Sequence, residues 1–556
     1  MDSAPGWIGS SRRLRWSSLL LIVLCAGLAI LVWQWIAGKP FWLDEEMIAL
    51  NVRDRAFGGA GSALWLGQSA PIAWLASERV LLLTLGTGER ALRLLPTVCG
   101  LATLVAAFWV GRRWMTVVGA AVLLVLLSCS EWLVYFPNEL KHYSADAFGG
   151  LLLPALAAWV AEGAVGTDAR PSLLTRALSW WAVAAFGQLF ANGFLFVTPG
   201  CALALLVILW HRAGSRAALT FAGLGAIWVA AFAVNYSLGL RFATSSAYLQ
   251  DYWSFALPPR SASALDITRW LARQAQPLAI KPGGTSLWLA FWAIAVSGLL
   301  LGRQPLALMG LTVAASLPAL AALRVAPLFE RMSIWAFPML YVGVALFVDA
   351  ALGLSRDFLA RRTLGGRLVA GAAVVCALVG LWPCADIIVR GHAAVVAEER
   401  RTNHQLDDRR GVNWLLRQQR PGDVWMTTRL GLPAVWWYGD VPVADPLAGA
   451  RQRDGTPLFE TRYEQTGSPC SSDEMRQALR GHRRILLYLG FRFDDVPTGF
   501  DDLLVNALNE FGTAVDGRGF GRFGRAWIID LQQPGTSAAR NGIWGGCIRL
   551  RAAERW

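Results

Sequence analysis

Residues 16–36, WSSLLLIVLCAGLAILVWQWI, and the residues FWLDEE at 41–46 decide the fold class. The first stretch is apolar over roughly 20 residues, which is the length that a helix needs to cross a bilayer. The second stretch ends in adjacent carboxylates at Asp44, Glu45 and Glu46. Carboxylates beside hydrocarbon are unfavourable unless something requires them there. The two stretches therefore predict a membrane helix followed by an acidic site at the membrane border.

The acidic run 44–46 has three interpretations from the residues alone. A carboxylate at this border can take a proton from a hydroxyl group, hold a metal ion, or mark the water-facing end of a helix. The apolar stretch has an alternative as well, a cleaved signal peptide, because its N-terminal flank is basic and the segment 36–38 resembles a cleavage site. We expect a membrane span instead, because the apolar run exceeds the core of a signal peptide, about 7 to 15 residues.

Composition extends the membrane assignment to most of the chain. Of 556 residues, 55% are hydrophobic and only 16% are charged, whereas soluble domains carry about 25% charged residues. The 28 tryptophans fit membrane–water interfaces. The net charge of +13 (51 basic minus 38 acidic residues) indicates anchoring to anionic lipid rather than nucleic-acid binding. The chain is also long enough for a separate soluble domain.

About eleven apolar stretches are long enough to be predicted as membrane helices. With the N-terminus in the cytoplasm, the short arginine-bearing segments between them fall on the cytoplasmic side, as the positive-inside rule requires. The longer loops and everything after about residue 388 then lie on the outer side. The predicted spans are 16–36, 92–110, 115–133, 145–162, 177–191, 194–210, 217–238, 286–302, 304–323, 333–353 and 367–387.

The composition changes near residue 388, where apolar runs shorten and charges become frequent. Helix-then-strand order recurs there, which is typical of an α/β domain with a partly parallel sheet. We therefore expect a helical membrane domain over 1–387 and an extracytoplasmic α/β domain over 388–556. The expected helices are 412–420, 473–480 and 503–511, and the expected strands are 423–427, 484–489 and 526–531.

Two features of this C-terminal region have competing interpretations. Residues 519–524, GFGRFG, match the spacing of a dinucleotide-binding loop, but a strand should precede such a loop and a helix should follow it. The expected order is the reverse, so we predict a flexible loop. Cys470 and Cys547 are either a disulfide in an oxidising compartment or two free thiols.

Cationic and aromatic residues gather in the outer loops. Lys141, one of three lysines in the chain, precedes His142 and Tyr143 at the start of a predicted span. A helix N-terminus with an adjacent lysine favours a phosphate, although Lys141 could instead anchor to lipid head groups. Arg331 opens a later span, where its guanidinium could grip a phosphate or pair with a neighbouring carboxylate.

Metal binding has no strong motif. The five histidines lack the spacing of a metal site. Carboxylates could still hold a divalent ion, so the expectation is no certain cofactor, with a divalent metal left open. The aromatic segment 248–253 suits stacking on a sugar and equally suits an interfacial belt.

The order and sidedness of several motifs resemble those of C-type, polyprenyl-phosphate-dependent membrane glycosyltransferases. The most similar group is the family of protein mannosyltransferases and lipid A aminoarabinose transferases, in its bacterial branch. The resemblance covers roughly 16–353. Its motifs are Asp44-Glu45, GQSAP at 67–71, ERALRLLP at 89–96, PNELKHYS at 137–144, Tyr252-Trp253, and Arg331 ahead of Phe337-Pro338.

The resemblance implies inverting transfer of a sugar from a polyprenyl phosphate to an acceptor hydroxyl, on the outer face of the bacterial plasma membrane. Asp44 would be the general base with Glu45 in support. Lys141, Tyr143 and Arg331, together with His142, would hold the donor phosphate. One departure is Asn192, where relatives often place a histidine, and this puts a metal-assisted variant in doubt.

The expected partners are the lipid-linked donor, membrane lipid and an acceptor glycan, lipid or protein, with no nucleic acid. A transporter or flippase of lipid-linked sugars is one alternative, and it predicts charges in the middle of spans. A non-catalytic envelope assembly protein is another, and it predicts that Asp44 is dispensable. Weaker substrate-binding candidates are Arg53, Glu89, Arg90, Glu139, Asp251, Tyr252 and Trp253.

Overall fold

The computed structural model describes residues 10–59, 61–164, 172–361, 363–400, 406–440, 456–465, 473–492, 500–533 and 546–550. By its internal contacts the chain forms two compact units. Unit 1 comprises residues 1–37, 69–77 and 93–397, and unit 2 comprises 38–68, 78–92 and 398–556. This partition differs from the boundary that composition predicted at 387. That boundary separates an expected membrane domain from an expected extracytoplasmic domain, and it stays a prediction.

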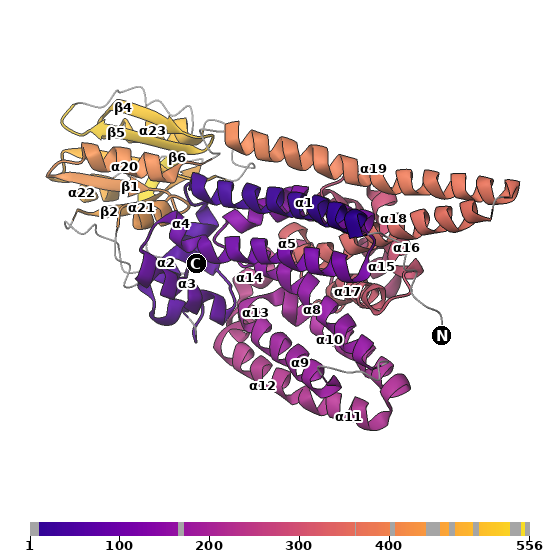
Figure 1. The fold of residues 1–556 in the computed structure, drawn as a ribbon. Helices are drawn as coiled ribbons and strands as arrows, with labels where there is room; N and C mark the ends of the chain where they lie inside the picture. Colours follow the sequence, from indigo (N-terminus) through magenta and orange to yellow (C-terminus); the bar gives the residue numbers. More distant parts are fainter. Residues whose placement is uncertain are drawn as a thin grey trace. The chain divides into compact units, whose positions relative to one another are not determined.

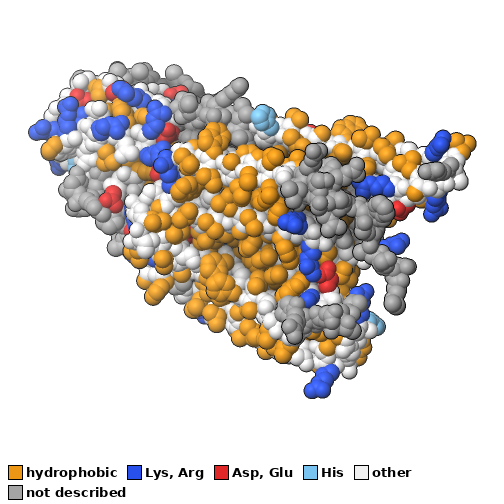
Figure 2. Space-filling model, viewed as in Figure 1, with side chains coloured by type: hydrophobic (Ala, Val, Ile, Leu, Met, Phe, Trp, Pro, Cys, Tyr) orange, Lys and Arg blue, Asp and Glu red, His pale blue; other side chains and the backbone are white. Residues whose placement is uncertain are grey.

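Unit 1 is helical, and Figure 1 shows its helices from indigo to orange. Many large apolar side chains of these helices are exposed, including Ile22, Leu203 and Val229. Figure 2 shows such side chains covering much of the visible face of this unit. Its longer helices are α1 Ser10–Ala37, α5 Leu94–Trp114, α6 Val117–Cys129, α8 Tyr143–Gly163, α9 Leu173–Phe190, α10 Asn192–Ala213, α11 Ser215–Leu224, α12 Ala226–Asn235, α15 Ala264–Ile280, α16 Trp288–Leu301, α17 Pro305–Ala322, α18 Phe337–Ala360 and α19 Leu364–Arg400.

Short helices connect these elements and shape the loops. In unit 1 they are α7 Glu131–Tyr135, η3 Phe136–Asn138, η4 Tyr236–Leu240, α13 Arg241–Ser245, α14 Ala247–Tyr252, η5 Ser254–Ala256 and η6 Glu330–Ala336. The first loop folds into α2 Leu43–Asp54, η1 Ala56–Gly59, η2 Trp65–Gly67 and α4 Glu89–Leu92 of unit 2. Helix α3, Ile72–Leu85, starts in unit 1 and ends in unit 2.

Eight helices in the described part of the chain are long and apolar enough to cross a membrane, or nine if a bent pair counts as one span. The prediction of a multi-pass helical membrane protein is confirmed, while the count of about eleven is not. The apolar stretch 115–133 bends by 63° after α6. The stretch 286–302 forms only the 14-residue α16. The stretch 177–191 falls mostly in α9, which is not among the eight helices that could cross a membrane.

Glycines let the helices of unit 1 pack closely, as is common in membrane helix pairs. A Cβ atom on Gly343 of α18 would overlap the carbonyl oxygen of Ala295 in α16. A Cβ atom on Gly298 would overlap the carbonyl oxygen of Gly343 in return. Likewise, a Cβ atom on Gly150 of α8 would overlap the carbonyl oxygen of Trp335 in η6. Backbone therefore packs directly on backbone between α16 and α18 and between α8 and η6, the element that contains Arg331.

The C-terminal part of unit 2 is an α/β domain, as predicted, with one six-stranded sheet in the order β4-β5-β3-β1-β2-β6 (Figure 1). Strand β1 pairs parallel with β2 and β3, whereas β4, β5 and β6 pair antiparallel with their neighbours. Its elements are α20 Asp408–Gln418, β1 Asp423–Thr427, α21 Leu432–Tyr438, β2 Leu458–Gln465, α22 Asp473–Ala478, β3 Arg484–Leu489, α23 Phe500–Leu508, β4 Thr513–Phe520, β5 Gly524–Asp530 and β6 Gly546–Leu550.

One segment of the C-terminal region differs from its prediction. Residues 519–524, expected to be a flexible loop after a helix, form the end of β4, a turn at Gly521 and the start of β5. Gly521 has a φ of +79°, a conformation that suits glycine in a tight turn. The hairpin was missed because glycine-rich sequence scores poorly as strand. Cys470 lies outside the described residues, as does the side chain of Cys547, so their pairing stays a prediction.

Candidate functional site

Helix α2 of unit 2 carries the three acidic residues in its first turn. The carboxylate Oε2 of Glu45 accepts a hydrogen bond of 2.9 Å from the backbone N–H of Trp42, which satisfies one of the free donors at the helix start. Glu45 and Glu46 are fully buried, whereas Asp44 is half-buried. Of the three carboxylates, Asp44 is therefore the one that a ligand can reach.

Glu46 belongs to a buried polar cluster within unit 2. Its carboxyl lies beside that of Asp408, and the phenol of Tyr488 donates a hydrogen bond to Asp408 Oδ1. Burial raises the pKa of Glu46 well above its ordinary value, and the neighbouring Asp408 raises it further. Burial likewise raises the pKa of Asp408 to about 7, against the opposing effect of the Tyr488 hydrogen bond. The two carboxyls therefore hold at least one proton between them near neutral pH.

A second polar connection in unit 2 involves Tyr438 of α21. Its hydroxyl accepts a hydrogen bond of 2.8 Å from the Phe41 N–H and donates one of 3.3 Å to Glu89 Oε1. Arg409 Nη1 reaches the same Glu89 oxygen at 3.1 Å. Burial raises the pKa of Tyr438 well above its ordinary value, and the nearby carboxylates of Glu46 and Glu89 add to this. Tyr438 thus stays a neutral donor.

Among the weaker substrate-binding candidates of unit 2, Arg53 has several hydrogen-bond partners. Arg53 holds Asp54 through two hydrogen bonds of 2.8 Å and donates to the carbonyl oxygen of Trp436 at 3.1 Å. Its guanidinium also lies 5.3 Å from the ring centroid of Trp437, within the range of a cation–π contact. Arg90, in α4, is exposed. Arg53 and Glu89 line one cavity of about 510 Å³.

In unit 1, Lys141 and His142 lead into α8, with Tyr143 as its first helical residue. All three are at least nine-tenths buried. His142 Nε2 lies 3.1 Å from the amide nitrogen of Asn192 and 3.6 Å from Asp146 Oδ2. Burial lowers the pKa of His142 to about 3, and the charge of Lys141 adds to this shift. His142 is therefore a neutral imidazole at physiological pH.

Arg331 lies among aromatic residues within unit 1. Its guanidinium carbon is 5.9 Å from the ring centroid of Trp253, and Tyr252 packs edge-on against Trp253 at 5.0 Å. Tyr143 is linked to the same loop, because its hydroxyl lies 3.8 Å from the sulfur of Met332. The structure therefore brings Tyr143, Arg331 and Trp253 to neighbouring positions.

The remaining candidates in unit 1 differ in their surroundings. Asp251 and Tyr252 are exposed on α14, whereas Glu139 is buried in the loop before Lys141. Glu330, beside Arg331, lies 3.8 Å from Lys281 Nζ. Thus the carboxylate next to Arg331 has a lysine of another loop as an ion-pair partner.

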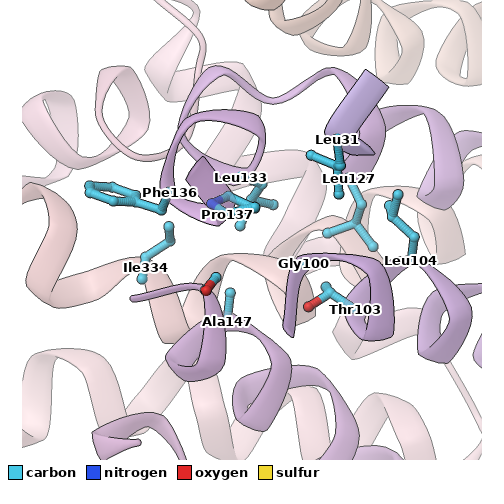
Figure 3. Close-up of a pocket in the computed structure, with 11 residues that line it drawn as sticks. Leu31, Gly100, Thr103, Leu104, Leu127, Leu133, Phe136, Pro137, Ala147 and Ile334 are labelled. Atoms are coloured by element: carbon cyan, nitrogen blue, oxygen red, sulfur yellow. The ribbon is translucent and has the colours of Figure 1, made fainter. Parts of the chain in front are cut away.

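A small cavity in unit 1 lies against the loop that carries Lys141, but it is too small to hold the donor phosphate. Figure 3 shows its lining from several helices, including Leu31, Pro137 and Ile334. Its volume of about 10 Å³ is close to that of a single water. The buried Ser144 hydroxyl, which has no partner among the described residues, also lines it. We assign it to the packing of the bundle.

Metal binding was tested against the side chains themselves. Within the ranges that the structure describes, no group of three or more His, Cys, Asp or Glu side chains is arranged to hold a metal ion. Glu46 and Asp408 are neighbouring carboxyl groups, but burial raises the pKa of both and so disfavours two free carboxylates. The described residues therefore do not fit a divalent ion, and no chemical step is assigned to one.

Several residues of the polar clusters were not predicted. Asp408, Arg409, Tyr438 and Tyr488 lie hundreds of residues from α2 along the chain. The one local signal was the charged run DDRR at 407–410, which lies at the start of α20. That signal indicates a helix start as readily as a functional site.

Two solved structures of ArnT support the fold class. The crystal structure of ArnT from Cupriavidus metallidurans bound to undecaprenyl phosphate has a TM-score of 0.52 and 14% identity over 93% of this chain and 98% of that chain. The apo structure gives 0.50 and 12% over 94% and 99%. Oligosaccharyltransferase AglB from Archaeoglobus fulgidus, in complex with an inhibitory peptide and a dolichol-phosphate, gives 0.45 and 12% over 93% and 74%.

No protein-family model and no curated protein sequence matches the chain. The likeness to ArnT is therefore one of fold, and it extends over nearly the whole of both chains. The chain has the architecture of a C-type membrane glycosyltransferase with a C-terminal α/β domain, so the resemblance inferred from its motifs is confirmed at the level of fold.

Proposed function

We propose that this protein is an inverting glycosyltransferase that moves a sugar from a polyprenyl phosphate to an acceptor hydroxyl on the outer face of the bacterial plasma membrane. The observation that carries the proposal is the ArnT-like fold over almost the full length of both chains. Because a fold hosts many functions, the site residues must add to it. Asp44 of unit 2 is half-buried, and Lys141 of unit 1 is buried, so each unit contains the type of residue that its proposed role requires.

Asp44 is the general base in this proposal. Glu45 accepts a hydrogen bond from the Trp42 N–H, and burial beside Asp408 raises the pKa of Glu46 well above its ordinary value. Asp44 is half-buried at the start of α2. It would accept the proton of the acceptor hydroxyl as that oxygen attacks the anomeric carbon. The bond between the anomeric carbon and the phosphate oxygen breaks in the same step, and the polyprenyl phosphate leaves with that electron pair.

Lys141, Tyr143 and Arg331 would bind the phosphate of the donor. Negative charge grows on the phosphate as it leaves, so fixed cations and hydroxyl donors stabilise the transition state. His142 is neutral, because burial lowers its pKa to about 3. It therefore contributes orientation and hydrogen bonding, while Lys141 and Arg331 supply the charge.

The test is an assay of purified protein in detergent with a panel of radiolabelled polyprenyl-phosphate sugars. The wild type is expected to release polyprenyl phosphate, and Asp44→Asn is expected to lose about 100-fold or more of that rate. Asp516→Asn, at an exposed carboxylate of β4, is the matched control and should keep full activity. Equal turnover by Asp44→Asn and wild type would remove Asp44 from the mechanism. An inactive wild type beside an active positive control would contradict the function.

A further inference from the structure

The cavity of about 510 Å³ lies wholly within unit 2. Its size falls within the range of about 300 to 1,000 Å³ that is usual for small-molecule sites. Side chains from the first loop and from the C-terminal domain line it together. They include Arg53 of α2, Glu89 of α4, Arg409 and Asn413 of α20, Tyr438 at the end of α21, and Asp440 two residues beyond it.

The charges on the cavity wall balance one another. Arg409 Nη1 lies 3.1 Å from Glu89 Oε1, and Arg53 Nη1 lies 3.9 Å from Asp440 Oδ1. A phosphate or carboxylate ligand would be repelled by Glu89 and Asp440. A cationic ligand would meet the two guanidinium groups. The wall therefore disfavours ligands of either net charge.

Hydroxyl groups match this wall, because each hydroxyl both donates and accepts a hydrogen bond. Guanidinium groups can only donate, carboxylates can only accept, and the Asn413 amide does both. Adjacent hydroxyls on a sugar ring can thus bridge the cation and the carboxylate of one pair.

Part of the wall is held in place before any ligand arrives. The Tyr438 hydroxyl is fixed between the Phe41 N–H and Glu89. Arg53 is fixed by Asp54 and the carbonyl oxygen of Trp436, and its side chain is only 11% exposed. The side chain of Asp440, in contrast, is 58% exposed. A rigid wall with an accessible rim lowers the entropy that binding must overcome.

We propose that this cavity binds a short neutral saccharide and is the acceptor site of the enzyme. The binding step follows from the cavity alone, whereas the acceptor role rests on the proposed glycosyl transfer. The site differs chemically from the proposed phosphate site, since the cavity combines carboxylates with arginines, whereas Lys141 before α8 and Arg331 of η6 would supply only positive charge to a phosphate.

Isothermal titration calorimetry on the full-length protein in detergent tests the binding step. The probes are neutral disaccharides of mannose, glucose, galactose and arabinose, with a glucuronate disaccharide and a glucosamine disaccharide as charged comparisons. At least one neutral disaccharide is expected to bind, and the charged ones are expected to bind at least tenfold more weakly. Absence of binding by every neutral probe at millimolar concentration would overturn the proposal, as would tighter binding of a charged probe.

Variants locate the binding. Asn413→Ala is expected to raise the Kd of the saccharide by about fivefold to tenfold through loss of hydrogen bonds. Thr87→Trp, at an exposed lining position, should abolish binding by filling the cavity. Arg417→Ala, exposed on the same helix as Asn413, is the control and should bind as the wild type does. Wild-type affinity in both cavity variants, with unchanged melting temperatures, would overturn the proposal.

Donor turnover in the same preparations separates this proposal from the proposed function. Turnover with no saccharide binding would leave the glycosyltransferase and exclude the cavity as its acceptor site. Saccharide binding that the cavity variants weaken, with no turnover of any donor, would support the binding site and count against the transferase.

Discussion

The phenol of Tyr488 donates a hydrogen bond to the carboxylate of Asp408, and the other side of Asp408 lies against Glu46. Three elements of unit 2 therefore meet at one buried polar cluster: α2, α20 and β3. Because Glu46 is two residues after Asp44, the cluster fixes the first turn of the helix that carries the proposed base.

The first prediction concerns the pH dependence of stability. Burial raises the pKa of both Glu46 and Asp408 in the folded state, and that of Asp408 reaches about 7. In the unfolded chain both groups release their protons near pH 4. Above that pH the folded state binds more protons than the unfolded state, so stability should fall as pH rises from about 4 to about 7. Glu46→Gln should flatten this slope and raise the melting temperature at pH 8.

Thermal melts of full-length wild type and Glu46→Gln across pH 4 to 8 check this prediction. Asp516→Asn, at an exposed carboxylate, serves as the control and should keep the wild-type slope. Parallel curves for wild type and Glu46→Gln would show that the buried pair is ionised in the folded protein.

The second prediction separates the roles of Asp44 and Glu45. Glu45→Gln weakens the hydrogen bond to the Trp42 N–H, so it should destabilise the start of α2 by about 1 kcal/mol. Asp44→Asn should change the free energy of unfolding by less than about 0.5 kcal/mol, yet abolish most turnover. Melting curves and initial rates on the same samples check both. A Glu45→Gln enzyme of normal stability but no activity would transfer the catalytic role to Glu45.

The third prediction concerns the donor phosphate. Lys141→Met and Arg331→Met each remove a cation proposed to contact the phosphate, so each should weaken binding of polyprenyl phosphate by about tenfold to 100-fold. Arg269→Met, at an arginine with a 63% exposed side chain, is the control. Competition by unlabelled polyprenyl phosphate in the transfer assay measures the effect. Unchanged competition in both variants would place the phosphate elsewhere.

The fourth prediction tests backbone packing between α16 and α18. A methyl group on Gly343 would overlap the carbonyl oxygen of Ala295, so Gly343→Ala should destabilise unit 1 by about 1 to 3 kcal/mol. Gly353 lies in the same helix and has nothing within 4 Å of its Cβ position. Gly353→Ala should therefore be neutral or stabilising by up to about 1 kcal/mol. Denaturation in detergent compares the two, and equal stabilities would refute the close approach.

The fifth prediction concerns a buried ion pair of the C-terminal sheet. Arg484 holds Asp423 through contacts of 2.6 and 3.0 Å, and the Asp423 side chain is only 1% exposed. Arg484→Met would leave a buried charge unpaired and should cost about 3 to 5 kcal/mol. Arg476→Met breaks an exposed pair with Glu510 and should cost less than about 1 kcal/mol. Urea denaturation followed by far-UV circular dichroism distinguishes them, and similar midpoints would count against the buried pair.

Local patterns in the sequence predicted much of the fold. The strands expected at 423–427 and 484–489 have those bounds as β1 and β3, because each is a short apolar run with polar flanks. The count of about eleven spans is not confirmed, because apolar composition does not show where a helix breaks. Stretch 115–133 bends after Cys129, and 286–302 is helical for only 14 residues.

The site was predictable only in part. Asp44, Lys141 and Arg331 were chosen from motifs whose residues are close in sequence. The neighbour of Glu46, Asp408, could not be predicted from local motifs, because it lies far along the chain. In addition, an acidic run at a helix start is ordinarily explained by helix capping. The saccharide cavity was equally hidden, because Arg409 and Asn413 become part of it only through tertiary folding.

The hydrogen bond from the Phe41 N–H to Tyr438 joins residues 397 positions apart. At a synthesis rate of about 5 to 20 residues per second, the ribosome needs about 20 to 80 s to make Tyr438 after Phe41. During that interval α2 exists without α21, whose Tyr438 bonds to Phe41. The membrane helices that lie between them in the sequence are inserted during the same interval. Folding of unit 2 would therefore be a late event, completed only after Tyr438 is made and can bond to Phe41.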